Sequence, residues 1–415
     1  MRSEQNADAE QLRRLLFETA RLERLQSTLL DNIVEGVLLQ DRTGRVVTSN
    51  SAALSILGLT ARELHGRKLH EMRSALRSDG TPWPAEERPT AAALRGGAGI
   101  RDRIVGVHVG DGLKWLSLNL DLVLDPTGEV EYVVSSIRDI TAEHAAEQAE
   151  QQAARCRRER VEALLRDGGP QVVVQAIVDL ATGWPVGAEA LSRFPGIAGP
   201  QTWFADAAAA GLGVELELAA LERALVVLDQ LPDDLYLSLN VSPEALGSPR
   251  LVDLLAGASA ERLVLELTEH VAVADYEQLA GPLGRLRCAG VRLAVDDAGS
   301  GFASLQHILN LAPDMIKLDH ALVSDVHTDP ARASLVACLV LFAERIGATL
   351  VAEGIEAPEE RAALLELGVR YGQGFHLGVP LTAPALAEAV CAPSRSTRGL
   401  PMEEACVPVP SSSHS

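Results

Sequence analysis

The sequence lacks the features that mark membrane, secreted and zinc-binding proteins. It has no apolar run long enough to span a bilayer, and it begins with a charged segment instead of the apolar stretch of a secretory signal. We therefore expect a cytoplasmic protein with no membrane partner. Its five cysteines are odd in number and form no CxxC pair, which argues against a disulfide framework and a zinc site. Cys288 and Cys338 lie in apolar helical patterns, so we expect them to fill space in the core.

Basic residues are also scarce. The chain has 37 Lys and Arg against 57 Asp and Glu, which gives a net charge of −20. Nucleic-acid binding depends on Lys and Arg side chains that contact phosphates, so we expect no nucleic-acid partner. A small phosphate ligand held through a metal ion is compatible with this charge. With 415 residues, of which 47% are hydrophobic, the chain is long enough for two or three globular domains.

The first part of the chain changes character near residue 27. Residues 1–26 carry Leu at helical spacing between charged residues, which predicts an amphipathic helix and is compatible with a homodimer joined by a coiled coil. Residues 27–142 contain short strands separated by turns, beginning with a hairpin formed by GVLLQD and RVVTSN. The proline-rich stretch at 79–89 is expected to be a loop.

This segment, 27–142, resembles a PAS domain in the residues GRVVTSNSAA, in the helical turns after them and in a closing strand that ends in Asp139-Ile140-Thr141. The resemblance implies an α+β sensor domain that binds a cofactor or small ligand, or dimerises, without indicating which. A flavin–thiol photosensor is excluded, because the first cysteine is Cys156, outside the segment. The candidate haem ligands are His65, His70 and His108. His65 and His70 lie in a polar stretch, where solvated side chains are the alternative.

Residues 143–168 form the next segment, a predicted helical linker placed to carry a signal from the sensor. Between 142 and 167 the chain is rich in Ala, Glu, Gln and Arg and contains no Gly or Pro, a composition that favours one continuous helix. Gly168-Gly169-Pro170 then ends it. At the far end of the chain, residues 392–415 have the composition of a disordered tail.

Between these segments, residues 169–391 alternate apolar strands with helical stretches. Such repeated β–α units predict a parallel sheet, and their number and length predict closure into a (β/α)₈ barrel. The first two strands are separated only by Ala181-Thr182-Gly183, which is too short for a helical crossover. They must pair as an antiparallel hairpin, so the fold class is α/β, a modified TIM-like barrel preceded by an α+β domain and helical linkers.

Polar residues stand at the carboxyl end of nearly every predicted barrel strand. They are Glu189, Asn240, Ser242, Glu266, Thr268, Glu269, Asp296, Asp297, Lys317, Asp319, Glu353, Glu356 and Gln373. These strand ends converge on one mouth of a barrel, where so many carboxylates would repel one another unless cations neutralised them. Any one of them could be a solvated strand end or a helix cap, but the repetition favours a divalent metal site. Oxygen ligands favour Mg²⁺ or Mn²⁺ over zinc.

The stretch Glu189-Ala190-Leu191-Ser192-Arg193 and the motifs after it, over about 171–390, resemble the EAL-domain cyclic di-GMP phosphodiesterases. The resemblance implies hydrolysis of cyclic di-GMP to pGpG with two Mg²⁺ or Mn²⁺ ions. It makes Glu189, Lys317 and Glu353 the catalytic residues. The metal ligands it implies are Glu189, Asn240, Glu266 and Asp296 for one ion, and Asp296, Asp297 and Glu353 for the other.

The resemblance also implies roles around the metals. Leu191 and Arg193 would contact the ligand, Arg193 through a phosphate, while Glu356 and Gln373 would support the ligands or the substrate. Glu269 would anchor the loop after Asp297, and Lys317 would touch the attacking water. From the residues alone, an ion pair with Asp319, two positions away on the same side of the strand, is the alternative for Lys317.

One stretch departs from the family's common pattern. Where the family usually has DDFGTGYSSL, this chain has Ala298, Ser300, Phe302 and Ala303, which puts in doubt the loop's packing and its coupling to dimerisation. We expect a PAS-regulated phosphodiesterase, with a catalytically silent cyclic di-GMP receptor as the alternative. An enzyme acting on another phosphodiester is disfavoured by the Glu189–Arg193 match, and the short linker leaves no room for a cyclase domain.

Overall fold

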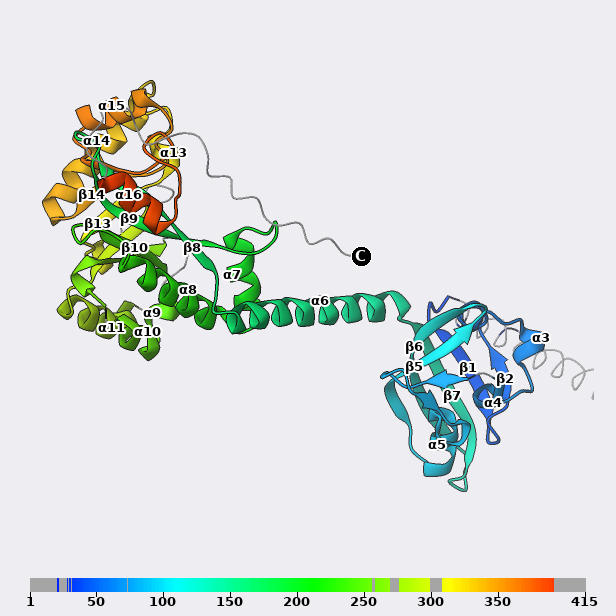
Figure 1. Cartoon of the computed structure of the whole chain (residues 1–415). Coiled ribbons are helices and arrows are strands. Elements are labelled where there is room, and N and C mark those ends of the chain that lie inside the picture. Colours follow the sequence, from blue (N-terminus) through cyan, green and yellow to red (C-terminus); the bar gives the residue numbers. More distant parts are fainter. Residues whose placement is uncertain are drawn as a thin grey trace, which may run out of the picture. The chain divides into compact units, whose positions relative to one another are not determined.

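The computed structural model describes residues 21, 28, 30, 32–72, 74–255, 258–268, 276–298 and 308–391. Within these ranges, the side chains of His70, Thr268, Glu277, Gln278 and Asp297 are not described. The predictions for most of the N-terminal helix, for Glu269, for the loop at 299–307 and for the tail at 392–415 lie outside the described residues. The chain divides into two compact units, Met1–Gln152 and Ala153–Ser415, whose elements are labelled in Figure 1.

The first unit contains an antiparallel sheet with strand order β2-β1-β7-β6-β5-β3-β4. Its strands are β1 (Gly36–Asp41), β2 (Val46–Ser49), β3 (Ala75–Leu76), β4 (Pro82–Trp83), β5 (Ile100–Val109), β6 (Gly112–Leu124) and β7 (Val130–Asp139). Its helices are α2 (Ser51–Leu57), α3 (Ala61–Leu64), α4 (Leu69–Met72) and α5 (Pro89–Gly96), with a 3₁₀ turn at Ala85–Glu87. The predicted hairpin is confirmed as β1 paired antiparallel with β2.

Local sequence explains where the short helices begin. The Asn50 side chain accepts a hydrogen bond from the backbone N–H of Ala53 at the start of α2, and Thr60 with Glu63 forms a capping box at α3. The prediction of a loop at 79–89 is wrong in part, because β4 and the 3₁₀ turn occupy five of its eleven residues. Pro82 is tolerated there since β4 is the last strand of the sheet, where a missing N–H breaks no pairing on the open side.

A small apolar cavity of about 70 Å³ lies inside this unit. Its lining includes Leu57, Val105 and Leu116 and contains neither His65 nor His108. Both histidines are exposed, and His65 Nε2 lies 3.1 Å from Ser49 Oγ. Ligand pockets usually measure roughly 300–1,000 Å³, so this cavity is too small for haem, and neither of these two histidines reaches it.

Helix α6 (Thr141–Arg166) is continuous over the predicted linker. At its start, Asp139 Oδ1 accepts hydrogen bonds from the backbone N–H and the hydroxyl of Thr141. After its end, Gly168 and Gly169 both adopt φ +88°, a left-handed conformation that glycine reaches without strain. No helix in the described ranges combines the length and apolarity needed to cross a membrane.

The second unit is built on a closed eight-stranded barrel with strand order β10-β11-β12-β13-β14-β15-β8-β9. Its strands are β8 (Gln171–Asp179), β9 (Pro185–Arg193), β10 (Tyr236–Val241), β11 (Leu263–Thr268), β12 (Arg292–Ala298), β13 (Met315–Leu318), β14 (Thr349–Ala352) and β15 (Tyr371–Gly372). Strand β8 runs antiparallel to both β9 and β15, and the other neighbours are parallel. The predicted modified barrel with an antiparallel start is therefore confirmed.

Helices surround these strands. They are α7 (Pro200–Ala209), α8 (Gly213–Leu228), α9 (Pro243–Leu246), α10 (Pro249–Leu255), α11 (Tyr276–Cys288), α13 (His320–Val323), α14 (Pro330–Ile346), α15 (Pro358–Glu366) and α16 (Ala383–Cys391), with a 3₁₀ turn at Ala260–Arg262.

Successive side chains of β10 point to opposite faces of the sheet and belong to two different apolar clusters. Leu237 and Leu239 join the large cluster that includes residues of α8, whereas Tyr236 joins a separate small cluster with residues of the other seven barrel strands. Period two then places Ser238 and Asn240 on the same face as Tyr236.

The expectation that Cys288 and Cys338 fill the core is wrong, because both are exposed. Helix α11 buries Leu279, Leu283 and Leu286, and Cys288 follows the last of these by two positions, or about 200° around the helix. Cys338 stands two positions after the buried Val336 in α14 and is turned outward for the same reason. The apolar pattern of each helix predicted burial but did not show on which face, buried or exposed, the cysteine lies.

Candidate active site

The carboxyl ends of the barrel strands bring together the residues that the sequence placed there. Glu189 stands in β9, Asn240 in β10, Glu266 in β11 and Asp296 in β12, with Lys317 in β13. Glu353 directly follows β14, where its backbone N–H donates to the carbonyl of Leu318, and Gln373 directly follows β15. Parallel pairing explains the convergence, since it aligns the ends of successive strands.

Lys317 lies at the centre of this cluster, and its side chain is buried. Its Nζ is 2.7 Å from Glu266 Oε2, 3.5 Å from Asp296 Oδ1 and 3.6 Å from Glu189 Oε2, and it also forms an ion pair with Glu353. The alternative partner from sequence, Asp319, instead accepts a hydrogen bond from the backbone N–H of Ala321 at the start of α13. A single ammonium therefore contacts carboxylates that stand in β9, β11 and β12 and directly after β14.

Neutral side chains orient two of these carboxylates. Asn240 Nδ2 donates to Glu189 Oε1 at 2.9 Å, and Gln373 Nε2 donates to Glu189 Oε2 at 2.8 Å. The hydroxyl of Ser238 donates to Glu266 Oε1 at 2.5 Å. Glu189 and Glu266 are thus held by neutral donors from other strand ends as well as by Lys317, and these shared hydrogen bonds fix the orientation of both carboxylates.

The charges of the cluster do not balance, because four carboxylates surround one ammonium. Burial raises the pKa of Glu266 well above its usual value, and the nearby carboxylates raise it further. Burial, together with repulsion from Asp296 and Glu189, raises the pKa of Glu353 to about 8. Burial alone would lower the pKa of Lys317, but its carboxylate neighbours raise it well above the usual value. Four carboxylates thus bring more negative charge than one ammonium can balance, and as a result Glu266 and Glu353 bind protons more readily than an isolated glutamate.

These residues fit a divalent cation by their chemistry. The donors are carboxylate and amide oxygens, the type that Mg²⁺ and Mn²⁺ prefer, and they carry the excess negative charge that a cation would balance. Within the described part of the chain, no three His, Cys, Asp or Glu side chains are spaced to hold a metal ion together. The oxygens of Glu189, Glu266, Asp296 and Glu353 are directed at the Lys317 ammonium instead. Asp297 belongs to β12, but its side chain is not described.

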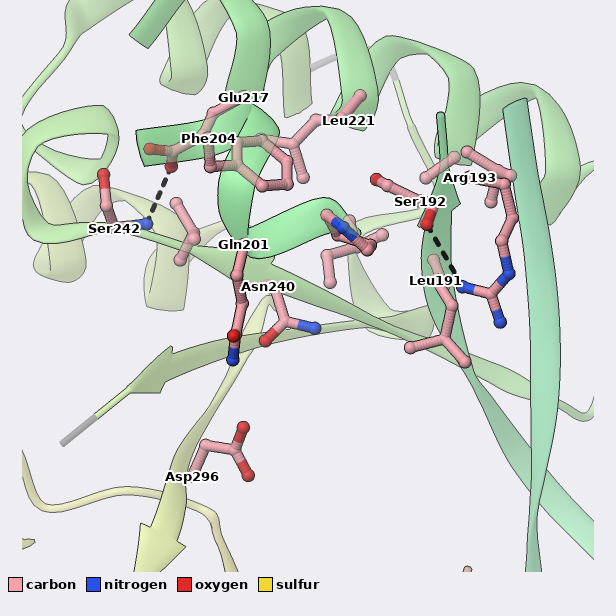
Figure 2. A pocket seen from close by; sticks show the side chains of 17 residues that line it. Leu191, Ser192, Arg193, Gln201, Phe204, Glu217, Leu221, Asn240, Ser242 and Asp296 are labelled. Atoms are coloured by element: carbon pink, nitrogen blue, oxygen red, sulfur yellow. Dashed lines mark hydrogen bonds between the residues drawn. The ribbon is translucent and has the colours of Figure 1, made fainter. Parts of the chain in front are cut away.

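A cavity of about 500 Å³ opens beside the cluster, and Figure 2 shows its lining. Leu191, Arg193, Asn240 and Asp296 reach it, as the sequence predicts for one mouth of the barrel. Arg193 is exposed, and its Nη1 donates to the carbonyl of Ser192 at 3.1 Å. The cavity thus combines a guanidinium, an amide and a carboxylate with an apolar wall.

Three polar or aromatic residues of this cavity were missed by the sequence analysis. Gln201 and Phe204 come from the first turns of α7, and Glu217 comes from α8 (Figure 2). Glu217 Oε2 accepts a hydrogen bond from the backbone N–H of Ser242 at 2.9 Å, and burial raises its pKa. The position of Glu217 between the buried Leu216 and Leu218 was the signal in the sequence that could have indicated a functional residue. No local pattern distinguished Gln201 from an ordinary surface residue.

Glu356 and Gln373 line a second hollow, of about 300 Å³, which also borders the cluster. Glu189 and Glu353 also line it, together with His320 and the exposed Phe375, which the sequence analysis did not single out. His320 Nδ1 lies 3.0 Å from the carbonyl oxygen of Gly354. A Cβ at Gly354 would come within 2.4 Å of the same nitrogen, so only glycine fits between β14 and His320.

Known proteins share this architecture. A family profile described as "EAL domain" matches residues 158–380, and one described as "PAS fold" matches residues 30–145. The cyclic di-GMP phosphodiesterase NbdA of Pseudomonas aeruginosa is 31% identical over 244 residues, which are 55% of this chain and 31% of that protein. RocR, a cyclic di-GMP phosphodiesterase of the same organism, is 30% identical over 230 residues, or 52% of this chain and 59% of that protein.

A solved structure shows the same fold. The EAL domain protein from Listeria monocytogenes is 23% identical, with a TM-score of 0.51, and the match covers 56% of this chain and 96% of that one. The chain spans between about a third and three fifths of the length of the two curated relatives. Since the EAL match extends over more than half of its 415 residues, the chain belongs to the EAL-domain family and carries a PAS fold before the barrel.

Proposed function

We propose that this protein hydrolyses cyclic di-GMP to pGpG and that its PAS unit regulates the reaction. The observation that carries the proposal is the Lys317-centred cluster beside the 500 Å³ cavity, in which the residues of the EAL resemblance converge. The relatives NbdA and RocR, both named cyclic di-GMP phosphodiesterases, support the substrate assignment at about 30% identity.

The residues present would hold two Mg²⁺ or Mn²⁺ ions. Glu189, Asn240, Glu266 and Asp296 would hold one, and Asp296 with Asp297 and Glu353 the other. Such ions supply the charge that activates water and neutralises the attacked phosphate. The unbalanced carboxylates of the cluster support this assignment, because a buried excess of negative charge is stable only with cations or protons nearby.

The chain's own side chains bind and orient the substrate in this proposal. Arg193, at the edge of the cavity, pairs with a phosphate, for which a guanidinium is well suited. The ring of Phe204 offers a face for a base, and the carboxylate of Glu217 can accept a hydrogen bond from a base N–H. Lys317 supplies a positive charge and a hydrogen-bond donor beside the attacking water. The four carboxylates around its ammonium hold that group in place, and the ammonium in turn orients the water.

Chromatography of cyclic di-GMP incubated with the full chain and Mg²⁺ tests the proposal. We expect pGpG from the wild type and none from Glu353→Ala, with Glu359→Ala as the control, because Glu359 is exposed in α15 outside the cluster. Binding of cyclic di-GMP without hydrolysis would establish the silent receptor instead. Absence of both binding and hydrolysis would end the proposal.

Two further parts of the proposal need their own measurements. We propose a homodimer, which sedimentation of the full chain tests, with a monomer at micromolar concentration as the contrary result. We also propose regulation by the PAS unit, whose ligand the residues do not identify. Equal hydrolysis rates with and without residues 1–152 would count against that regulation.

A further inference from the structure

The end of helix α6 packs against the barrel unit next to the substrate cavity. Val161 is fully buried, and Leu164 and Leu165 pack with it against Trp203 of α7. Trp203 is itself only 3% exposed. The last turns of the linker helix therefore belong to the core of the barrel unit and form an outer layer over α7.

Arg160, one residue before Val161, makes a specific contact with this layer. Its guanidinium lies 4.2 Å from the centroid of the Trp203 ring and forms an ion pair with Asp206, which is also in α7. Arg157 Nε lies 3.8 Å from the same carboxylate. The indole Nε1 of Trp203 has no hydrogen-bond partner among the described residues, so ring contacts fix its position.

Aromatic contacts extend from Trp203 to the cavity wall. The rings of Trp203 and Phe194 are stacked, with centroids 5.2 Å apart, and Phe194 meets Phe204 edge-on at 5.4 Å. Phe204 lines the cavity. Phe194 directly follows Arg193, whose side chain lines the same cavity as Phe204 (Figure 2). Both the apolar and the cationic parts of the wall are therefore tied to one aromatic cluster.

We infer that Arg160 is a positioning residue for the substrate cavity. Its contact with Trp203 holds the rings of Phe194 and Phe204 in place. Because Phe194 follows Arg193 directly, the same contact also holds the backbone from which the Arg193 side chain extends. This inference rests on the proposed function and deepens it by assigning to the linker helix a part of substrate binding. Arg160 does not line the cavity, and the Lys317 cluster is carried by other strands. Its removal should therefore weaken substrate binding and leave the chemical step intact.

Steady-state kinetics on the full chain with cyclic di-GMP and Mg²⁺ test the inference. For Arg160→Ala we expect KM to rise about five-fold, which corresponds to about 1 kcal/mol, with kcat within about two-fold of wild type. Arg160→Lys retains the charge over the ring and should give an intermediate KM. Arg155→Ala removes an exposed arginine of the same helix and should behave as wild type. An unchanged KM in Arg160→Ala would overturn the inference, as would an equal fall in kcat.

Hydrogen exchange of the backbone amides separates this inference from the proposed function. In Arg160→Ala, exchange should quicken in residues 194–204 and stay unchanged in β11, whether or not the protein hydrolyses cyclic di-GMP. If the wild type neither binds nor hydrolyses the dinucleotide, the proposed function fails, and faster exchange at 194–204 still shows that Arg160 positions this wall. Unchanged exchange there would refute the positioning role even in an active enzyme.

Discussion

Lys317 Nζ lies 2.7 Å from Glu266 Oε2, and the two side chains are 3% and 1% exposed. A buried ion pair at this distance is costly to break from one side, because the remaining charges lose their compensation. Here the loss would be larger than for an isolated pair, since three other carboxylates share the same ammonium.

Replacing Lys317 by Met should therefore destabilise the barrel unit. We expect a fall of about 3 kcal/mol in the free energy of unfolding, measured with urea in the presence of a chelator. Arg370→Ala is the control, because Arg370 is 71% exposed in its pair with Asp179 and should cost about 0.5 kcal/mol. Equal costs for the two variants would show that the buried cluster contributes no special stability.

Glu189 accepts hydrogen bonds from two neutral side chains, those of Asn240 and Gln373. Its removal should abolish turnover without unfolding the protein. We expect Glu189→Gln to lower kcat at least about 100-fold, as loss of a group that holds or orients a metal does. Circular dichroism should remain as in wild type. Glu215→Gln changes an exposed residue of α8 and should remain fully active. Normal turnover by Glu189→Gln would refute the assignment of metal ligands.

Metal binding should raise the stability of the barrel unit, because a ligand that binds only the folded state stabilises it by mass action. We expect Mg²⁺ or Mn²⁺ to raise the melting temperature of the wild type after chelator treatment. The same titration should have little effect on Asp296→Ala, which lacks the carboxylate proposed to bridge both ions. A shift of equal size in both proteins would place the metal elsewhere.

Glu360 should give the stability a pH dependence outside the catalytic cluster. Burial raises the pKa of its carboxyl, but hydrogen bonds from the backbone N–H groups of Glu356, Asp325 and Ala357 lower it more, so the net shift is downward. Because the folded-state pKa lies below the unfolded value of 4.5, the stabilisation is present above pH 4.5 and is lost as the pH falls through the folded-state pKa.

Glu360→Gln should therefore be less stable than wild type by about 1 kcal/mol at pH 7. Urea unfolding at a series of pH values should show the two proteins converging as the solution becomes more acidic than pH 4.5. The exposed neighbour Glu359, changed to Gln, should follow the wild-type curve. A constant difference between Glu360→Gln and wild type at all pH values would contradict the role of the charge.

Truncation should show that the end of α6 is part of the barrel unit. A protein of residues 153–415 retains Arg160 and Val161, whereas one of residues 168–415 exposes the apolar surface around Trp203. We expect the shorter protein to melt several degrees lower, since each buried aliphatic side chain contributes roughly 1.5–3 kcal/mol. Equal melting temperatures would show that the linker helix packs on this surface without stabilising it.

The sequence by itself determined the architecture and most of the candidate site. The short connection between β8 and β9, five residues from Leu180 to Trp184, is a local feature that forces antiparallel pairing, and the structure confirms it. The strands are also local, because period two and turn residues act over a few positions. Once the barrel closes, polar residues at strand ends such as Glu189, Glu266 and Asp296 must converge.

Only the tertiary structure decided which of these groups touch. Sequence alone left Asp319 as an alternative partner for Lys317, yet the carboxylates that pair with it stand in β9, β11 and β12 and directly after β14. Phe204 and Glu217 reach the cavity only through the packing of α7 and α8. Arg160 meets Trp203 across 43 positions of sequence, a contact that no local pattern encodes. Burial and pairing between distant segments are properties of the packed chain, so they are absent from the periodicity of any one segment.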